Sequence, residues 1–99
     1  MPKSSKKGAV LTAQQIRAAR GWLAWSQEEL AKRANVALRT VASFERGEQV
    51  PRPNNLIAIR HVIEEAGVRL LFDDEGKAAG VARTDTIGKL ARRAGRSKR

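Results

Sequence analysis

The sequence predicts a mainly α-helical domain: a compact bundle of four or five helices, followed by a short β-hairpin and a basic C-terminal tail. Three observations support this fold class. Two helix-start signals stand at Thr12 and Ser26, and turn-forming residues follow each expected helix. After Gly67 the helical spacing of apolar residues gives way to a β-branched and aromatic run, which is typical of a strand.

The first two helices are predicted from their N-terminal caps. Thr12 precedes Gln15 by three residues, and Ser26 precedes Glu29 by three. Both pairs have the pattern of a capping box, in which the two side chains satisfy free backbone amides reciprocally. These signals predict helices over residues 13–23 and 27–34. The apolar neighbours expected to pack in the core or staple the two caps are Leu11, Ile16, Trp22, Trp25 and Leu30.

A third helix is expected after a tight turn. Asn35 tolerates the left-handed conformation that ends a helix, and the next helix begins near Leu38 and stops at Gly47. Val41 and Phe44 are three residues apart and face the core, which leaves polar side chains on the other face. Two helices joined by a tight turn, the second polar on its outer side, form a helix-turn-helix.

Three stretches carry a family resemblance: Ser26-Gln27-Glu28-Glu29-Leu30-Ala31, Ala34-Asn35-Val36, and Thr40-Val41 with Phe44-Glu45-Arg46-Gly47. Residues 12–67 resemble the XRE, or lambdoid-repressor (Cro/C1-type), helix-turn-helix family. The resemblance implies a lambda-repressor-like bundle in which residues 12–67 are the DNA-binding domain. Two positions depart from the pattern: Asn35 replaces the usual Gly, and Ala37 replaces the Ser or Thr that caps the recognition helix. A cap worth about 1 kcal/mol is therefore missing.

A fourth helix is expected over residues 54–66, after a loop that contains two prolines. Its predicted core stripe is Leu56, Ile59, Ile63 and Ala66. Ile57 and Val62 widen the apolar face beyond what one small core needs. Two interpretations are open: these side chains cover the tryptophans, or they form a subunit interface.

A β-hairpin is expected after the fourth helix. Residues 68–72 have strand composition, residues 73–76 form a turn, and residues 81–84 return as a second strand. A two-stranded hairpin alone is marginal, so it should pack on the fourth helix or pair with a second subunit. Residues 68–85 are accordingly the candidate dimerisation segment.

The charge is concentrated at both ends of the chain. Lys and Arg number 20 against 10 acidic residues, and the net charge is +10. Residues 12–85 are nearly neutral, whereas the N-terminal arm (1–11) and the C-terminal tail (86–99) contain cations and no acidic residue. This pattern favours a polyanion as partner, with both ends following the DNA backbone. The alternative is that these ends only aid solubility.

Several classes of protein are disfavoured by composition. The chain has no cysteine for a disulfide or thiolate metal site, and no apolar run of the roughly 20 residues that a membrane span needs. No secretory signal is visible, so a cytoplasmic protein is expected. With one histidine, no tyrosine and no phosphate-binding glycine loop, we expect no enzyme, no cofactor and no metal.

The resemblance implies roles for the recognition helix. Its first two residues and its sixth, which are Leu38, Arg39 and Ser43, would read base edges. A guanidinium fits the O6 and N7 of guanine, so Arg39 is the strongest candidate; the alternative is a phosphate contact. Thr40 and Ser43 each suit a base or a phosphate.

The remaining candidates are phosphate contacts and one structural pair. The phosphate candidates are Gln27, Arg52, Lys3, Lys6 and Lys7. Gln27 and Arg52 stand beside helix starts, where free amides attract anions. Arg20 and Glu45 resemble a family ion pair that ties the first helix to the third.

These features predict a regulator of transcription, most simply a repressor, that binds double-stranded DNA at an inverted repeat as a homodimer. Two half-sites are needed because one short recognition helix reads few base pairs. The alternative is an antitoxin or other operon regulator that also holds a partner protein, such as a toxin, for which residues 68–84 would be the docking strand.

Overall fold

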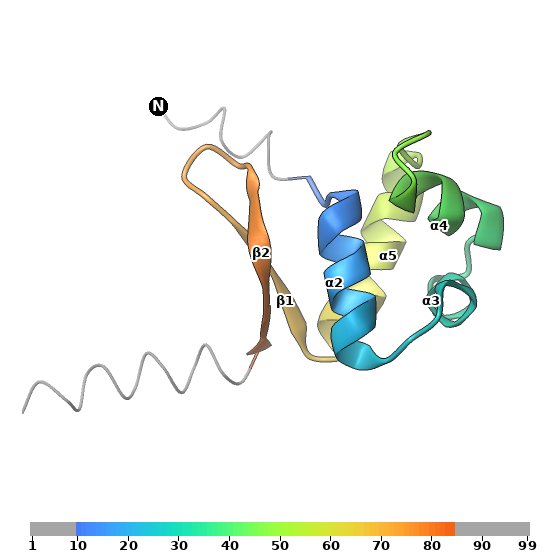
Figure 1. Ribbon diagram of the computed structural model, residues 1–99, viewed down its shortest axis with the longest axis horizontal. Coiled ribbons are helices and arrows are strands. Elements are labelled where there is room, and N and C mark those ends of the chain that lie inside the picture. The colour runs from blue at the N-terminus through green and yellow to red at the C-terminus, as the bar shows by residue number, and fades with distance from the viewer. Residues whose placement is uncertain (1–9, 85–99) are drawn as a thin grey trace, which may run out of the picture.

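The computed structural model describes residues 10–84, in which four helices precede a two-stranded antiparallel sheet (Figure 1). The elements are α2 (Ala13–Leu23), α3 (Gln27–Ala34), α4 (Leu38–Glu45), α5 (Pro53–Glu65), β1 (Val68–Phe72) and β2 (Ala78–Arg83). In Figure 1, α2 and α5 stand in the middle, with α3 and α4 on one side and the hairpin on the other. The predicted fold class is confirmed. No helix within residues 10–84 is long and apolar enough to cross a bilayer.

The two predicted capping boxes differ in outcome. At α2 the box is complete: Thr12 Oγ1 accepts from the Gln15 amide at 3.3 Å, and Gln15 Oε1 accepts from the Thr12 amide at 3.1 Å. At α3 only half forms. Ser26 Oγ accepts from the Glu29 amide at 2.9 Å, whereas the Glu29 carboxylate accepts from Arg33 Nε at 2.7 Å. A bond between two charged groups is stronger than one to a neutral amide, so Glu29 turns toward the guanidinium one turn away.

Left-handed residues end the first two helices. Asn35 has a φ of 58°, as its place after α3 predicts, and Ala24 ends α2 with a φ of 60°. The second case could not be read from the sequence, because an alanine seldom adopts this conformation, at a cost of roughly 1–2 kcal/mol. Ala37 precedes α4 without a side-chain cap, as predicted. Gly47, with a φ of 78°, turns the chain just beyond α4.

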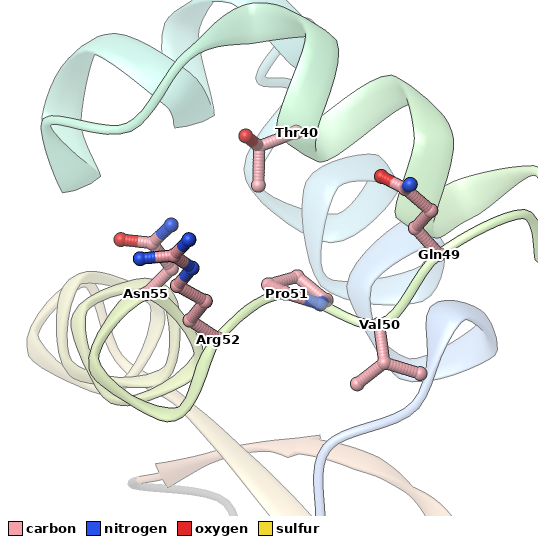
Figure 2. A pocket seen from close by; sticks show the side chains of 6 residues that line it. All are labelled: Thr40, Gln49, Val50, Pro51, Arg52 and Asn55. Atoms are coloured by element: carbon pink, nitrogen blue, oxygen red, sulfur yellow. The ribbon is translucent and has the colours of Figure 1, made fainter.

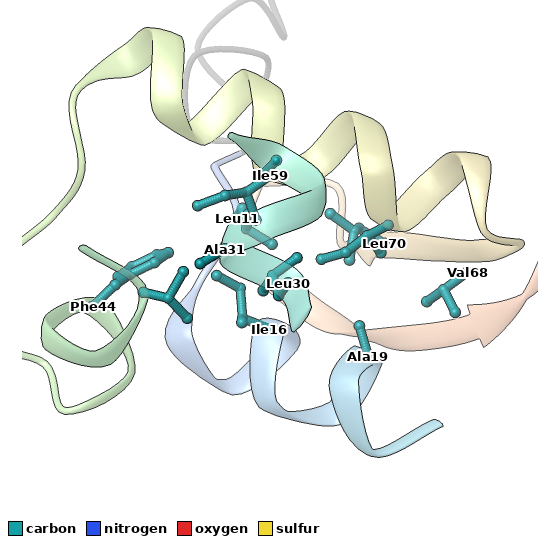
Figure 3. Close-up of a cluster of buried hydrophobic side chains, with 12 residues drawn as sticks. Leu11, Ile16, Ala19, Leu30, Ala31, Phe44, Ile59, Val68 and Leu70 are labelled. Carbon is teal, nitrogen blue, oxygen red and sulfur yellow. The ribbon is translucent and has the colours of Figure 1, made fainter. Parts of the chain in front are cut away.

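One hydrophobic core draws on all six elements and on the segment before α2 (Figure 3). Its buried members are Leu11, Ile16, Ala19, Leu30, Ala31, Ala34, Val41, Phe44, Ile59, Ile63, Val68 and Leu70. Val68 and Leu70 come from β1, and the strands pack on α5 and α2. The expected packing of the hairpin on the fourth helix is therefore confirmed, and pairing with a second subunit stays a prediction.

Three expectations about individual positions are wrong. Trp22 is 60% exposed, because the last buried residue of α2 is Ala19 and the next turn extends past the core. Ala66 is exposed, because it is the C-cap of α5 and lies beyond the last helical turn that packs on the core. The helix itself begins at Pro53 rather than at residue 54. The second strand begins at Ala78 rather than at residue 81.

The earlier start of β2 follows from a tight turn around Asp73. The Asp73 amide donates to the Lys77 carbonyl at 2.8 Å, and Asp73 Oδ1 accepts from the amides of Glu75 and Lys77 at 2.9 Å each. The loop is thus closed within a few residues. Strand pairing resumes directly after it, with Phe72 opposite Ala78.

A single glutamine joins the helices to the hairpin. Gln15 is 2% exposed, and its Nε2 donates to the carbonyls of Leu71 at 2.9 Å and Gly80 at 3.0 Å. These two residues face each other across the strands, next to an irregularity in the ladder that leaves Ala79 unpaired. The Gln15 Oε1 already accepts from the Thr12 amide. One side chain therefore caps α2 and holds both strands.

We expect Gln15→Leu to lower the free energy of unfolding by about 2–4 kcal/mol, because leucine keeps the volume but leaves several buried backbone groups without a partner. Urea unfolding measures this loss, and amide exchange should be fastest in the hairpin. The control is Gln14→Leu, an exposed neighbour on the same helix, with a change of at most about 0.5 kcal/mol. Equal stability of the two variants would contradict the role assigned to Gln15.

Candidate nucleic-acid interface

The first turn of α4 is open to solvent on the side of the molecule opposite the hairpin (Figure 1). Leu38 is 47% exposed, Arg39 is exposed and Thr40 is half-buried. The exposed leucine side chain leaves apolar surface in contact with water, directly beside the guanidinium of Arg39. It suits a groove that offers both a methyl group and hydrogen-bond acceptors, as the DNA major groove does.

Ser43 lies less open than its position on the helix suggests. It is 9% exposed and lines a hollow whose other residues are Arg39, Thr40, Glu48 and Gln49. The Glu48 amide donates to the Ser43 carbonyl at 2.9 Å and the Gly47 amide to the Phe44 carbonyl at 3.0 Å, the pair of bonds that ends a helix at a left-handed glycine. Ser43 is thus nearly buried at the edge of this hollow, whereas Leu38 and Arg39 are exposed.

A second hollow of about 450 Å³ lies between α4 and the start of α5 (Figure 2). Its lining is Thr40, Gln49, Val50, Pro51, Arg52 and Asn55. In Figure 2, Arg52 and Asn55 stand opposite Thr40 across the opening. A guanidinium, two side-chain amides and a hydroxyl are groups that bind phosphate oxygens. Arg52 is a phosphate candidate from the sequence, whereas Gln49 and Asn55 become candidates only from this geometry; the available signal was the Asn54-Asn55 pair in the first turn of a helix.

An ion pair sets α4 against α2. Arg20 Nε and Nη2 donate to the two carboxylate oxygens of Glu45 at 2.7 Å each, and Nη1 donates to the Trp25 carbonyl at 3.0 Å. The Glu45 side chain is only 4% exposed and that of Arg20 is 20% exposed. All three bonds are made by one planar guanidinium, so the pair fixes direction as well as distance.

Two further donors complete this cluster. Gln27 Nε2 donates to Glu45 Oε1 at 2.9 Å, and Arg17 Nη1 donates to the Glu45 carbonyl. Gln27, the expected phosphate contact, is thus bonded to the carboxylate that positions α4. An amide nitrogen carries two N–H groups, so this bond leaves the second one for a phosphate.

The Glu45 carboxylate is held in its charged form. Burial alone would raise its pKa, but hydrogen bonds from Arg20 and Gln27, together with the charges of Arg20 and Arg17, outweigh burial. The pKa of Glu45 consequently lies below its ordinary value. The same hydrogen bond raises the pKa of Arg20, so both partners stay ionised.

Some expected residues lie elsewhere. Lys3, Lys6, Lys7 and the tail over residues 86–99 are outside the described residues. His61 is exposed on α5, with Nε2 3.5 Å from a carboxylate oxygen of Glu65. Over residues 10–84, no three His, Cys, Asp or Glu side chains come together as a metal site.

Comparison with known proteins agrees with the arrangement of α3 and α4 as a helix-turn-helix. Residues 16–64 match the family model described as helix-turn-helix. The match begins inside α2 and ends at the last turn of α5, so it contains α3 and α4 entirely. None of the curated proteins compared with the chain is significantly similar to it.

We expect Glu45→Gln to be less stable than the wild type at neutral pH and to lose less stability in acid. A lowered folded pKa contributes stability above the ordinary pKa of about 4.3, and this contribution is lost as the pH falls through the folded value. Urea unfolding from about pH 7 to about pH 3 measures both effects. The exposed Glu64→Gln is the control, and a wild-type acid slope in Glu45→Gln would contradict the argument.

Proposed function

Because residues 16–64 form a helix-turn-helix domain of the Cro/C1-type, XRE family, we propose that the protein is a sequence-specific regulator of transcription, with α4 in the DNA major groove. The family consists typically of non-enzymatic regulators, and its domain implies DNA binding. The observation that carries the proposal is the exposed first turn of α4, which presents an arginine and a leucine outward.

Base reading is assigned to the start of α4. Arg39 donates two parallel hydrogen bonds to guanine O6 and N7, and Leu38 packs on a thymine methyl group. Thr40 stands between this turn and the hollow that contains Arg52, so it serves a base or the neighbouring phosphate. Ser43, which is largely covered, has a smaller share in base recognition than the other three.

Phosphate binding is assigned to the residues around α4. Arg52 and Asn55 at the start of α5 bind one phosphate through the hollow that Thr40 also lines, with Gln49 at its edge. Gln27 at the start of α3 binds a second phosphate while Glu45 keeps its amide oriented. Such contacts fix the register of the protein on the duplex, and base contacts then read the sequence.

The proposed form on DNA is a homodimer that occupies an inverted repeat and represses by blocking the promoter. Val68 and Leu70 of the hairpin are buried in the chain's own core, which favours the face of α5 over the hairpin as the interface. Of the two candidates on that helix, Val62 packs against the core, and Ile57 is 65% exposed. Ile57 borders an apolar hollow of about 290 Å³ with Val10, Leu11, Pro53, Leu56 and Arg60.

We expect Arg39→Ala to weaken binding to the cognate site by roughly 1–3 kcal/mol and to relax the preference for one G·C pair in each half-site. Selection from a random duplex library supplies the cognate site, and titration against cognate and scrambled duplexes gives both affinities. Arg69→Ala, an exposed arginine on β1, is the control and should bind as the wild type does. An equal loss on both duplexes would make Arg39 a phosphate contact.

We expect Ile57→Asp to weaken dimerisation by at least about tenfold, because a symmetric interface would bring two desolvated carboxylates together. Sedimentation equilibrium measures the dimer constant, and circular dichroism verifies that the helices are retained. Trp22→Asp removes an equally exposed apolar side chain from α2 and should leave the dimer constant unchanged. An unchanged dimer in Ile57→Asp would move the interface to the outer face of the hairpin.

A further inference from the structure

Glu48 places a negative charge directly beside the proposed DNA-binding residues. It is exposed and lines the same hollow as Arg39, Thr40 and Ser43. Its position is fixed by the backbone, since Gly47 turns the chain with a φ of 78° and the Glu48 amide donates to the Ser43 carbonyl at 2.9 Å. A carboxylate at this place meets any duplex that receives α4.

Glu48 also forms an ion pair with the guanidinium of Arg46. Arg46 Nε and Nη2 donate to its two carboxylate oxygens at 2.9 Å and 3.0 Å. Both side chains remain more than half exposed, at 57% and 55%. The hydrogen bond from Arg46 lowers the pKa of Glu48, so the carboxylate is charged at neutral pH. The fork geometry of this pair is the one that a guanidinium makes with a phosphate.

We propose that Glu48 competes with DNA phosphate for Arg46. Arg46 is then a phosphate-binding residue: it is paired with Glu48 in the free protein and with a DNA phosphate in the complex. This inference rests on the DNA-binding function proposed above. It concerns the sequence-independent part of the affinity, because phosphates are present in every duplex whereas the base contacts of Arg39 are not.

Charge density makes the competition effective. Duplex DNA has about one phosphate per 1.7 Å of its axis, and charges interact over about 10 Å at 0.1 M salt. Several phosphates therefore lie within range of Glu48 once α4 is in the groove. An exposed ion pair contributes little free energy, so Arg46 loses little when it exchanges Glu48 for a phosphate. Both side chains are on the surface, so the exchange needs no rearrangement of the fold.

The test is a double-mutant cycle on DNA affinity. We expect Glu48→Gln to raise the affinity for a scrambled duplex by about three- to tenfold and to steepen the slope of log affinity against log salt by about 0.9 per subunit, because no carboxylate then offsets the charge of Arg46 at the phosphate. The gain should be much smaller when Glu48→Gln is made in an Arg46→Gln background. An equal gain in that background would overturn the exchange of partner.

A matched control separates local from global charge. Glu64→Gln adds the same charge to the protein and frees Arg60, whose Nε lies 3.0 Å from a Glu64 oxygen on α5. It should change DNA affinity much less than Glu48→Gln, and an equal gain would overturn the proposal. A loss of cognate affinity in Glu48→Gln, with altered preference at one base pair, would instead make Glu48 a base contact.

Titration of the wild-type protein with DNA distinguishes failure of the proposed DNA binding from failure of the competition between Glu48 and phosphate. If the wild-type protein binds no duplex even at low salt, the proposed function fails and this inference fails with it. If the wild type binds and Glu48→Gln leaves affinity and salt slope unchanged, only the competition between Glu48 and phosphate is refuted.

Discussion

The position of α4 depends on one buried carboxylate. An eight-residue helix is too short to be stable alone, and α4 also lacks a side-chain cap at its start. Glu45, its last residue, binds Arg20 from α2 and Gln27 from α3, and Arg20 in turn binds the Trp25 carbonyl between those helices. Two helices, α2 and α3, and the segment between them are thereby tied to the end of α4 that lies furthest from Arg39. The exposed first turn can project because its other end is held.

The helix α2 serves as the support for two separate contacts. On one side Arg17 and Arg20 bind the last residue of α4, and on another Gln15 binds both strands of the hairpin. The hairpin adds Val68 and Leu70 to the common core, so it completes the bundle as a further helix would. Deletion of the hairpin would expose this core and destabilise the whole domain. Single substitutions therefore test dimerisation more cleanly than a truncation does.

Local chemistry explains what the sequence could predict. Caps and left-handed turns depend on residues three or four apart, and so the bounds of α2 and α3 and the role of Asn35 were predictable. The bonds of Gln15 to Leu71 and Gly80 span more than fifty residues and leave no local pattern. Neither the exposure of Trp22 nor the burial of Ser43 was predictable, since each depends on how the elements pack in three dimensions.

Pairing of charges within the fold limits how DNA can be held. Arg20, Arg33, Arg46 and Arg60 each have a carboxylate partner among residues 10–84. Arg39 and Arg52 make no ion pair with the part of the chain that the structure describes, and both border the hollows around Thr40. In the function proposed here, general attraction to DNA is assigned to the basic residues over 1–11 and 86–99, where the sequence has cations and no acidic residue. The same proposal leaves the folded part to discriminate between sequences, a task for which a nearly neutral surface with a few fixed donors is better suited than a strongly basic one.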